Sequence, residues 1–111
     1  MKLSHEIYDD AVVVSINGEL IADDLEPFRR LVQERLEAGT RDFVLDVAQT
    51  DFIDSKGLET ILWLQETVGE RLGQLRLSAP SENVGKILQI TRLDNQFDTH
   101  KDVDEAIKSL R

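Results

Sequence analysis

Short β-branched runs alternate along this chain with longer segments in which apolar residues recur every three or four positions. Strands are expected at about 2–8, 11–16, 43–48, 74–79 and 96–99, and helices at about 24–38, 56–72, 82–92 and from Asp102 onward. Strands separated by a helix run parallel, because the crossover helix returns the chain to the same edge of the sheet. The first two runs are joined only by Asp9-Asp10 and therefore form a hairpin. The pattern predicts an α/β fold with a mixed, mostly parallel sheet of about five strands and about four helices.

Composition and charge limit the kind of protein and the kind of partner. A chain of 111 residues with 41% hydrophobic and 32% charged residues is expected to form a single domain over residues 1–111. Cysteine is absent and no apolar run reaches membrane-spanning length, so we expect a cytoplasmic protein without membrane insertion. The net charge of −9 argues against nucleic acid, because phosphate backbones are bound by clustered Lys and Arg. A protein partner is expected instead.

Ser55 lies where an apolar strand has ended and an amphipathic helix begins, within Asp51-Phe52-Ile53-Asp54-Ser55-Lys56-Gly57-Leu58. The first turn of a helix has backbone N–H groups without intrahelical partners and carries the positive end of the helix dipole. One interpretation is therefore a phosphate held on Ser55, with Gly57 clearing space for it. The alternative is that Asp54 or Ser55 simply caps the helix, as such residues do at most helix starts. The two interpretations are compatible, since a capping serine can also carry phosphate.

The only tryptophan of the chain is expected on the water-facing side of the second predicted helix. At about 100° per residue, Leu58, Leu64 and Leu72 share one side of this helix, whereas Trp63 falls almost opposite them with Glu59. An exposed tryptophan is a candidate partner contact, because tryptophan is enriched at binding hot spots. The alternative is a ring that lies flat on neighbouring aliphatic stems.

No arrangement of residues indicates catalysis or a bound cofactor. Asp46, Asp51 and Asp54 near one end of the sheet could form a carboxylate site for Mg²⁺, but solvated turn aspartates are the simpler interpretation. His5 and His100 lack Glu or Cys at metal-ligand spacing and are expected at the surface. The pattern Gly-x-Ser-x-Gly of a nucleophile elbow does not occur. We therefore expect a protein that is not an enzyme and needs no cofactor or metal.

The order of these motifs resembles the STAS family, which includes anti-sigma factor antagonists and domains of sulphate transporters. Four regions in register carry the resemblance: Asn17-Gly18-Glu19-Leu20, Phe43-Val44-Leu45-Asp46, Phe52-Ile53-Asp54-Ser55-Lys56-Gly57-Leu58, and Ile90-Thr91-Arg92-Leu93 with Asp104-Glu105-Ala106-Ile107. Three positions depart from the common pattern. Ile21 stands where Asp is common, Lys56 where Ser or Thr is common, and Arg92 where a helix-ending glycine is common.

The resemblance implies a phosphorylation switch. In the antagonists that this chain resembles, the serine after the motif's aspartate is phosphorylated by an anti-sigma factor that is itself a serine-protein kinase. The unphosphorylated antagonist binds this kinase, and a serine phosphatase resets the cycle. By position the acceptor is Ser55, and the expected partner-binding residues are Asp23, Asp24, Asp54, Lys56, Gly57, Glu59 and Trp63. The alternative is a STAS scaffold subunit of an ABC-type transporter or signalling complex, without a phosphorylation cycle.

Overall fold

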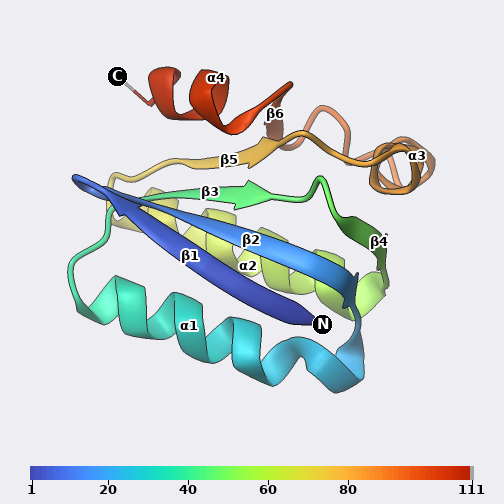
Figure 1. Cartoon of the computed structure of the whole chain (residues 1–111), viewed down its shortest axis with the longest axis horizontal. Coiled ribbons are helices and arrows are strands. Elements are labelled where there is room, and N and C mark those ends of the chain that lie inside the picture. Colours follow the sequence, from blue (N-terminus) through green and yellow to red (C-terminus); the bar gives the residue numbers. More distant parts are fainter. Residues whose placement is uncertain (111) are drawn as a thin grey trace.

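A six-stranded sheet forms the middle of the fold, which a computed structural model describes for residues 1–110. Its strands are β1 (Lys2–Tyr8), β2 (Ala11–Leu20), β3 (Asp42–Asp46), β4 (Thr50–Ile53), β5 (Leu75–Ser78) and β6 (Asp98–His100). The order is β1-β2-β3-β5-β6, and β4 pairs with the last residues of β2 (Figure 1). The β1–β2 pair is antiparallel, and the other strand pairs of the described residues are parallel. The predicted α/β fold with a mixed, mostly parallel sheet is confirmed.

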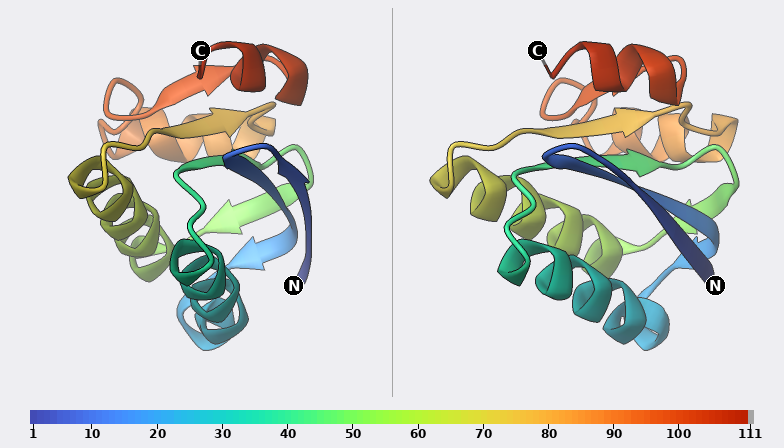
Figure 2. Two further views of the ribbon diagram at one scale, coloured as in Figure 1. Left: turned by 90° about the vertical axis from the view of Figure 1, so that its left-hand side faces the viewer. Right: turned by 60° about the vertical axis from the view of Figure 1, so that its left-hand side comes forward.

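Helices cover both faces of this sheet (Figure 2). They are α1 (Leu25–Glu37), α2 (Ser55–Glu70), α3 (Glu82–Ile90) and α4 (Val103–Lys108), and a short 3-10 turn, η1 (Ala22–Asp24), leads into α1. The first three helices contribute to the main core, in which Phe28, Phe43 and Leu64 are fully buried. A smaller core of Val13, Val44 and Ala106 lies beneath α4 on the opposite face. Burial from both sides explains why β3 is an almost continuous apolar run.

The strand arrangement gathers three connecting segments at one edge of the sheet. The η1 turn follows β2, α2 follows β4, and α3 follows β5. Because these strands run parallel, the segments after them meet at the carboxyl edge, where open α/β sheets commonly place their sites. Ser55 therefore lies among loops that are far apart in sequence.

Three strands differ from their predicted positions, and one of them, β3, ends at Asp46 rather than at residue 48. The second strand continues to Leu20 rather than ending at residue 16, although Asn17-Gly18 is typical of a turn. An irregularity in register between Gly18 and Glu19 lets the strand continue and pair with β4, which the sequence did not predict. The last strand spans Asp98–His100 instead of 96–99.

Two helices end earlier than predicted. The second ends at Glu70, and Leu72 beyond it has a left-handed φ of 64° and an 88% exposed side chain, so its predicted place on the core side is wrong. The third ends at Ile90 rather than 92, and Arg92 has a left-handed φ of 62°. That conformation favours glycine, which accounts for glycine being common at this position in the STAS family. Within residues 1–110, no helix combines the length and the apolar character needed to cross a membrane.

Candidate functional site

Asp54 caps α2 and also ties it to the segment that follows β2. Its Oδ1 accepts a hydrogen bond of 2.8 Å from the Gly57 N–H, and its Oδ2 accepts one of 3.0 Å from the Ala22 N–H. These bonds, the one from Gly57 above all, hold the pKa of the Asp54 carboxyl below its usual range, because they stabilise the charged form. The turn that carries Asp23 and Asp24 is thereby fixed beside the first turn of α2.

Ser55 is the first residue of α2, and its side chain is exposed. Asp54 rather than Ser55 is the N-cap, so the helix start does not use the serine hydroxyl. Among residues 1–110, this hydroxyl makes no hydrogen bond. The arrangement leaves an accessible hydroxyl at the positive end of the α2 dipole, which is a chemically suitable place for a phosphate.

Gly57 has a different role from the predicted one. It is buried, and a Cβ added there would overlap the Leu20 carbonyl oxygen and lie 2.8 Å from the Cγ2 of Ile53. The missing side chain lets the first turn of α2 pack directly on the end of β2. The prediction that Gly57 clears space for a phosphate or a partner is therefore wrong, because that space is filled by the protein's own backbone.

Lys56 and Glu59 form the exposed flank of the same turn. The Lys56 Nζ lies 3.4 Å from the Glu59 Oε2, and both side chains are more than half exposed. An ion pair this exposed contributes little to stability, about 0.2–1 kcal/mol. Both side chains are consequently free to rearrange toward a partner, and the cation next to Ser55 is shared with a carboxylate.

Trp63 lies between α1 and α2 rather than pointing into water. Its side chain is partly buried and packs against the main core. The Arg29 guanidinium of α1 lies 5.7 Å from the centre of the ring and donates a hydrogen bond of 3.3 Å to the Thr60 Oγ1. The prediction of a water-facing tryptophan is therefore wrong. The helical periodicity of α2 predicts which of its residues face the sheet, but it does not predict that α1 packs beside Trp63.

Phe52 is an exposed aromatic residue near Ser55 that the sequence reasoning did not single out as a site residue. It lies on β4 with 45% of its surface exposed, three positions before Ser55. The neighbouring Ile53 is buried, and successive side chains of a strand point to opposite faces, so Phe52 points away from the core. Recognising 50–53 as a strand would have revealed it.

Among residues 1–110, the carboxylates and histidines considered as metal ligands do not gather into one site. The Asp46 carboxylate accepts hydrogen bonds from the Ser15 hydroxyl at 3.3 Å and the Ala48 N–H at 3.2 Å. In the part of the chain that the structure describes, no three His, Cys, Asp or Glu side chains gather as metal ligands. His5 is exposed as predicted, but the His100 side chain is only 19% exposed and lies beside Glu105. The prediction of a surface position thus holds only in part for His100, whose side chain is partly buried.

Comparison with known proteins identifies relatives of the whole fold. The sequence model of the STAS domain matches residues 2–106. A Thermotoga maritima protein named "Putative anti-sigma factor antagonist" is 28% identical over 108 residues, which is 96% of each chain. A crystal structure described with the same words and from the same organism is 26% identical, with a TM-score of 0.90 over 98% of this chain and 94% of that one.

The fold also resembles SpoIIAA, which is described as an anti-sigma factor antagonist. Its unphosphorylated form is 23% identical, with a TM-score of 0.85 over 99% of this chain and 96% of that one. The phosphorylated form of the Bacillus protein is 21% identical, with a TM-score of 0.78 over 99% and 100% of the two chains. At this level of identity the likeness establishes the fold alone.

Proposed function

Because the chain belongs to the STAS family, we propose that it is an anti-sigma factor antagonist whose binding is switched by phosphorylation of Ser55. The observation that carries the proposal is the division of roles at the start of α2. Asp54 caps the helix, which leaves the Ser55 hydroxyl exposed and without a structural task. A modification there can change the surface without unfolding the helix beneath it.

The proposed docking face surrounds Ser55. It comprises the η1 turn with Asp23 and Asp24, the exposed flank of Lys56 and Glu59, and the ring of Phe52. The Asp54 carboxylate fixes the turn beside the helix, and its backbone bonds make it a positioning group for this face. Trp63 lies two turns further along α2, and only the part of its side chain that the core and Arg29 leave exposed is available to a partner.

Phosphorylation would add a charge of about −1.5 to −2 to this face. The phosphate would lie beside the Asp54 carboxylate, and the cation adjacent in sequence, Lys56, is already paired with Glu59. A dianion enclosed by a partner without new cations loses its hydration, and it would be repelled by Asp54. We therefore propose that unphosphorylated protein binds an anti-sigma factor with serine-kinase activity and that phosphorylated protein dissociates until a phosphatase resets it.

In this proposal the protein is a substrate and a binding partner, not an enzyme. ATP belongs to the kinase, and the site described here needs no cofactor of its own. The proposed setting is the cytoplasm.

A second candidate is a STAS scaffold subunit that docks without a phosphorylation cycle. The observation that favours it is Lys56. This residue stands where the family commonly has a second hydroxyl residue, and its side chain is paired with Glu59. In that case the same face would bind its partner permanently, and Ser55 would remain unmodified.

Mass spectrometry of the protein recovered from its native cells distinguishes the two candidates. We expect phosphate on Ser55 in at least one growth condition. Ser81 is a matched control, because it also begins a helix but its Oγ accepts from the Val84 N–H at 3.2 Å and donates to the Thr50 carbonyl at 2.6 Å. Phosphate confined to Ser81 or another residue would contradict the switch. Its absence in every condition tested would favour the scaffold.

A further inference from the structure

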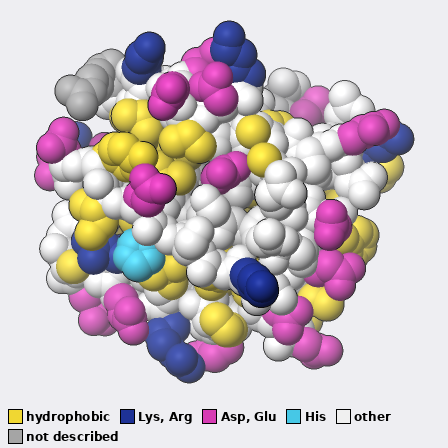
Figure 3. Space-filling view, viewed as in Figure 1, with side chains coloured by type: hydrophobic (Ala, Val, Ile, Leu, Met, Phe, Trp, Pro, Cys, Tyr) yellow, Lys and Arg dark blue, Asp and Glu magenta, His cyan; other side chains and the backbone are white. Residues whose placement is uncertain are grey.

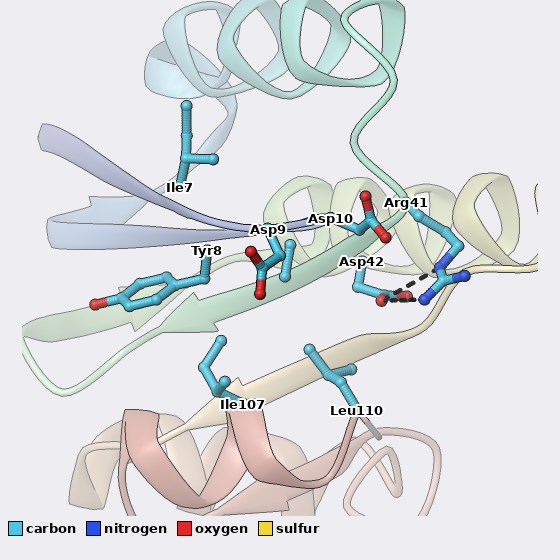
Figure 4. A pocket seen from close by; sticks show the side chains of 9 residues that line it. Ile7, Tyr8, Asp9, Asp10, Arg41, Asp42, Ile107 and Leu110 are labelled. Carbon is cyan, nitrogen blue, oxygen red and sulfur yellow. Dashed lines mark hydrogen bonds and ion pairs between the residues drawn. The ribbon is translucent and has the colours of Figure 1, made fainter.

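A groove opens at the opposite end of the molecule from Ser55. Its volume is about 680 Å³, and it lies between the β1–β2 turn, the start of β3 and α4 (Figure 4). Ser55 follows the carboxyl edge of the strands, whereas the groove is at the edge where β2 and β3 begin. The two regions share no residue.

Apolar side chains lie on two sides of the groove, among charged residues that also line it. On the hairpin side, the Tyr8 side chain is 42% exposed and faces α4, whereas the Ile7 side chain points to the other face of the sheet, as its strand partner Val12 does (Figure 4). On the other side, Ile107 and Leu110 extend from α4 toward the hairpin (Figure 4). They rest on the small core formed by Val13, Val44 and Ala106, so this wall is anchored. In the space-filling view, yellow apolar atoms gather between α4 and the hairpin (Figure 3).

The rim of the groove is acidic. Glu6, Asp10 and Asp104 are exposed around it, whereas the cation that lines it, Arg41, lies 3.4 Å from the Asp42 carboxylate. The Tyr8 hydroxyl donates a hydrogen bond of 2.7 Å to the Glu6 Oε2. This bond and the charges of Glu6 and Asp104 raise the pKa of Tyr8, because they disfavour a tyrosinate beside them. The electrostatic potential over the apolar side chains of the groove is thus negative.

We propose that this groove is a second docking surface, which binds an amphipathic helix of a partner protein that presents apolar side chains flanked by Lys and Arg. Apolar walls accept the apolar face of such a helix, and the acidic rim attracts its cations. A second copy of this chain fits less well, since it would bring the same carboxylates against Glu6, Asp10 and Asp104. An anionic membrane surface would be repelled for the same reason.

The groove does not depend on the proposed Ser55 switch. A partner bound between the hairpin and α4 would leave η1, Phe52 and the first turn of α2 uncovered. The protein could therefore hold one partner while the other is exchanged. We expect Ser55→Asp to leave binding in the groove unchanged, which separates this inference from the proposed function.

The first test uses a designed peptide of roughly 18 residues, five helical turns, with Leu on one face and Lys on the others. Added to the isotopically labelled full chain, it should shift backbone NMR signals of the hairpin turn, the start of β3 and α4. Two control peptides should bind much more weakly: a scrambled one of equal composition without an apolar face, and one with Glu in place of Lys. Shifts centred on the first turn of α2, or equal binding of the scrambled peptide, would overturn the proposal.

The second test uses substitutions in matched pairs. Tyr8→Ser should weaken binding of the peptide about fivefold to tenfold, whereas Leu72→Ser, at an apolar side chain exposed outside the groove, should not. Asp10→Asn combined with Asp104→Asn should weaken binding about threefold to tenfold at low salt. The control for charge is Glu34→Gln with Asp94→Asn, which removes the same charge from exposed positions elsewhere.

The other possible occupants are outcomes that contradict the proposal. Sedimentation of the protein alone would reveal dimers, and dimers abolished by Tyr8→Ser would assign the groove to a second copy. Sedimentation with vesicles of anionic lipid would reveal membrane binding, and its loss in the same variant would assign the groove to a bilayer. We expect neither association.

Discussion

Gly57→Ala tests the packing that positions the candidate site. The Cβ of alanine would overlap the Leu20 carbonyl oxygen and lie 2.8 Å from the Ile53 Cγ2. The Leu20 carbonyl oxygen is a backbone atom, and it cannot rotate out of the way as the end of a flexible side chain can. The first turn of α2 must therefore move away from β2, which lengthens the hydrogen bond from the Ala22 N–H to the Asp54 carboxylate.

The expected loss of stability follows from two opposing effects. In a helix, alanine is favoured over glycine by up to about 1 kcal/mol, and by less in the first turn. Inserting a methyl group into a filled space costs about 1–3 kcal/mol, and a backbone obstacle places this change at the upper end. We expect the free energy of unfolding to fall by about 2 kcal/mol, which lowers the melting temperature by roughly 8 °C for a domain of this size.

Urea denaturation followed by far-UV circular dichroism measures this change, and two other helical glycines serve as controls. An added Cβ at Gly69 or Gly85 meets nothing within 4 Å. Gly69→Ala and Gly85→Ala should therefore raise the free energy of unfolding by about 0.5–1 kcal/mol. If the free energy of unfolding of Gly57→Ala equals that of the wild type, or rises as in the two controls, α2 does not pack on β2 as described.

Two further predictions concern the groups next to this turn. Asp54→Asn should cost about 1–2 kcal/mol at neutral pH, because each carboxylate oxygen accepts a backbone N–H and an amide leaves one of these donors unmatched. Because folding lowers the pKa of Asp54, its stabilising contribution is complete above the unfolded value of 3.8 and is lost as the pH falls further. The difference in free energy of unfolding between the wild type and Asp54→Asn should therefore narrow only below about pH 4. Asp51→Asn is the exposed control. Arg29→Ala should shift Trp63 emission to the red and increase acrylamide quenching, with about 0.5–1 kcal/mol of lost stability, because the guanidinium covers the ring. Arg30→Ala, whose side chain pairs with Glu26 instead, should leave the spectrum unchanged, and an unchanged spectrum in both variants would contradict the position of Trp63.

Local patterns in the sequence were sufficient for most of the architecture. The heptad-like spacing of Leu25, Phe28, Val32 and Leu36 and the apolar run of β3 are signals that extend over a whole element. The strand β4 gave no such signal, because it has four residues and only its two ends are buried. It exists because the last residues of β2 pair with it, which is a contact between distant segments.

The candidate site was predictable only in part for the same reason. Ser55 was singled out because a serine at a helix start is a local feature, and the cap that Asp54 provides leaves its hydroxyl unused by the helix. The true role of Gly57 depends on Leu20, and the cover over Trp63 depends on Arg29. Neither neighbour can be identified from spacing along α2. The groove at the other end likewise exists only because α4 returns to the hairpin.

The most direct test of the central claim is the affinity of the protein for the anti-sigma factor kinase of its own organism, with and without phosphate on Ser55. Titration calorimetry should be done with the unmodified protein, with phosphoserine incorporated at position 55, and with Ser55→Ala. We predict that the unmodified protein and Ser55→Ala bind alike and that phosphoserine weakens binding by at least about tenfold, or 1.4 kcal/mol. Equal affinity of the phosphorylated and unmodified proteins would contradict the switch.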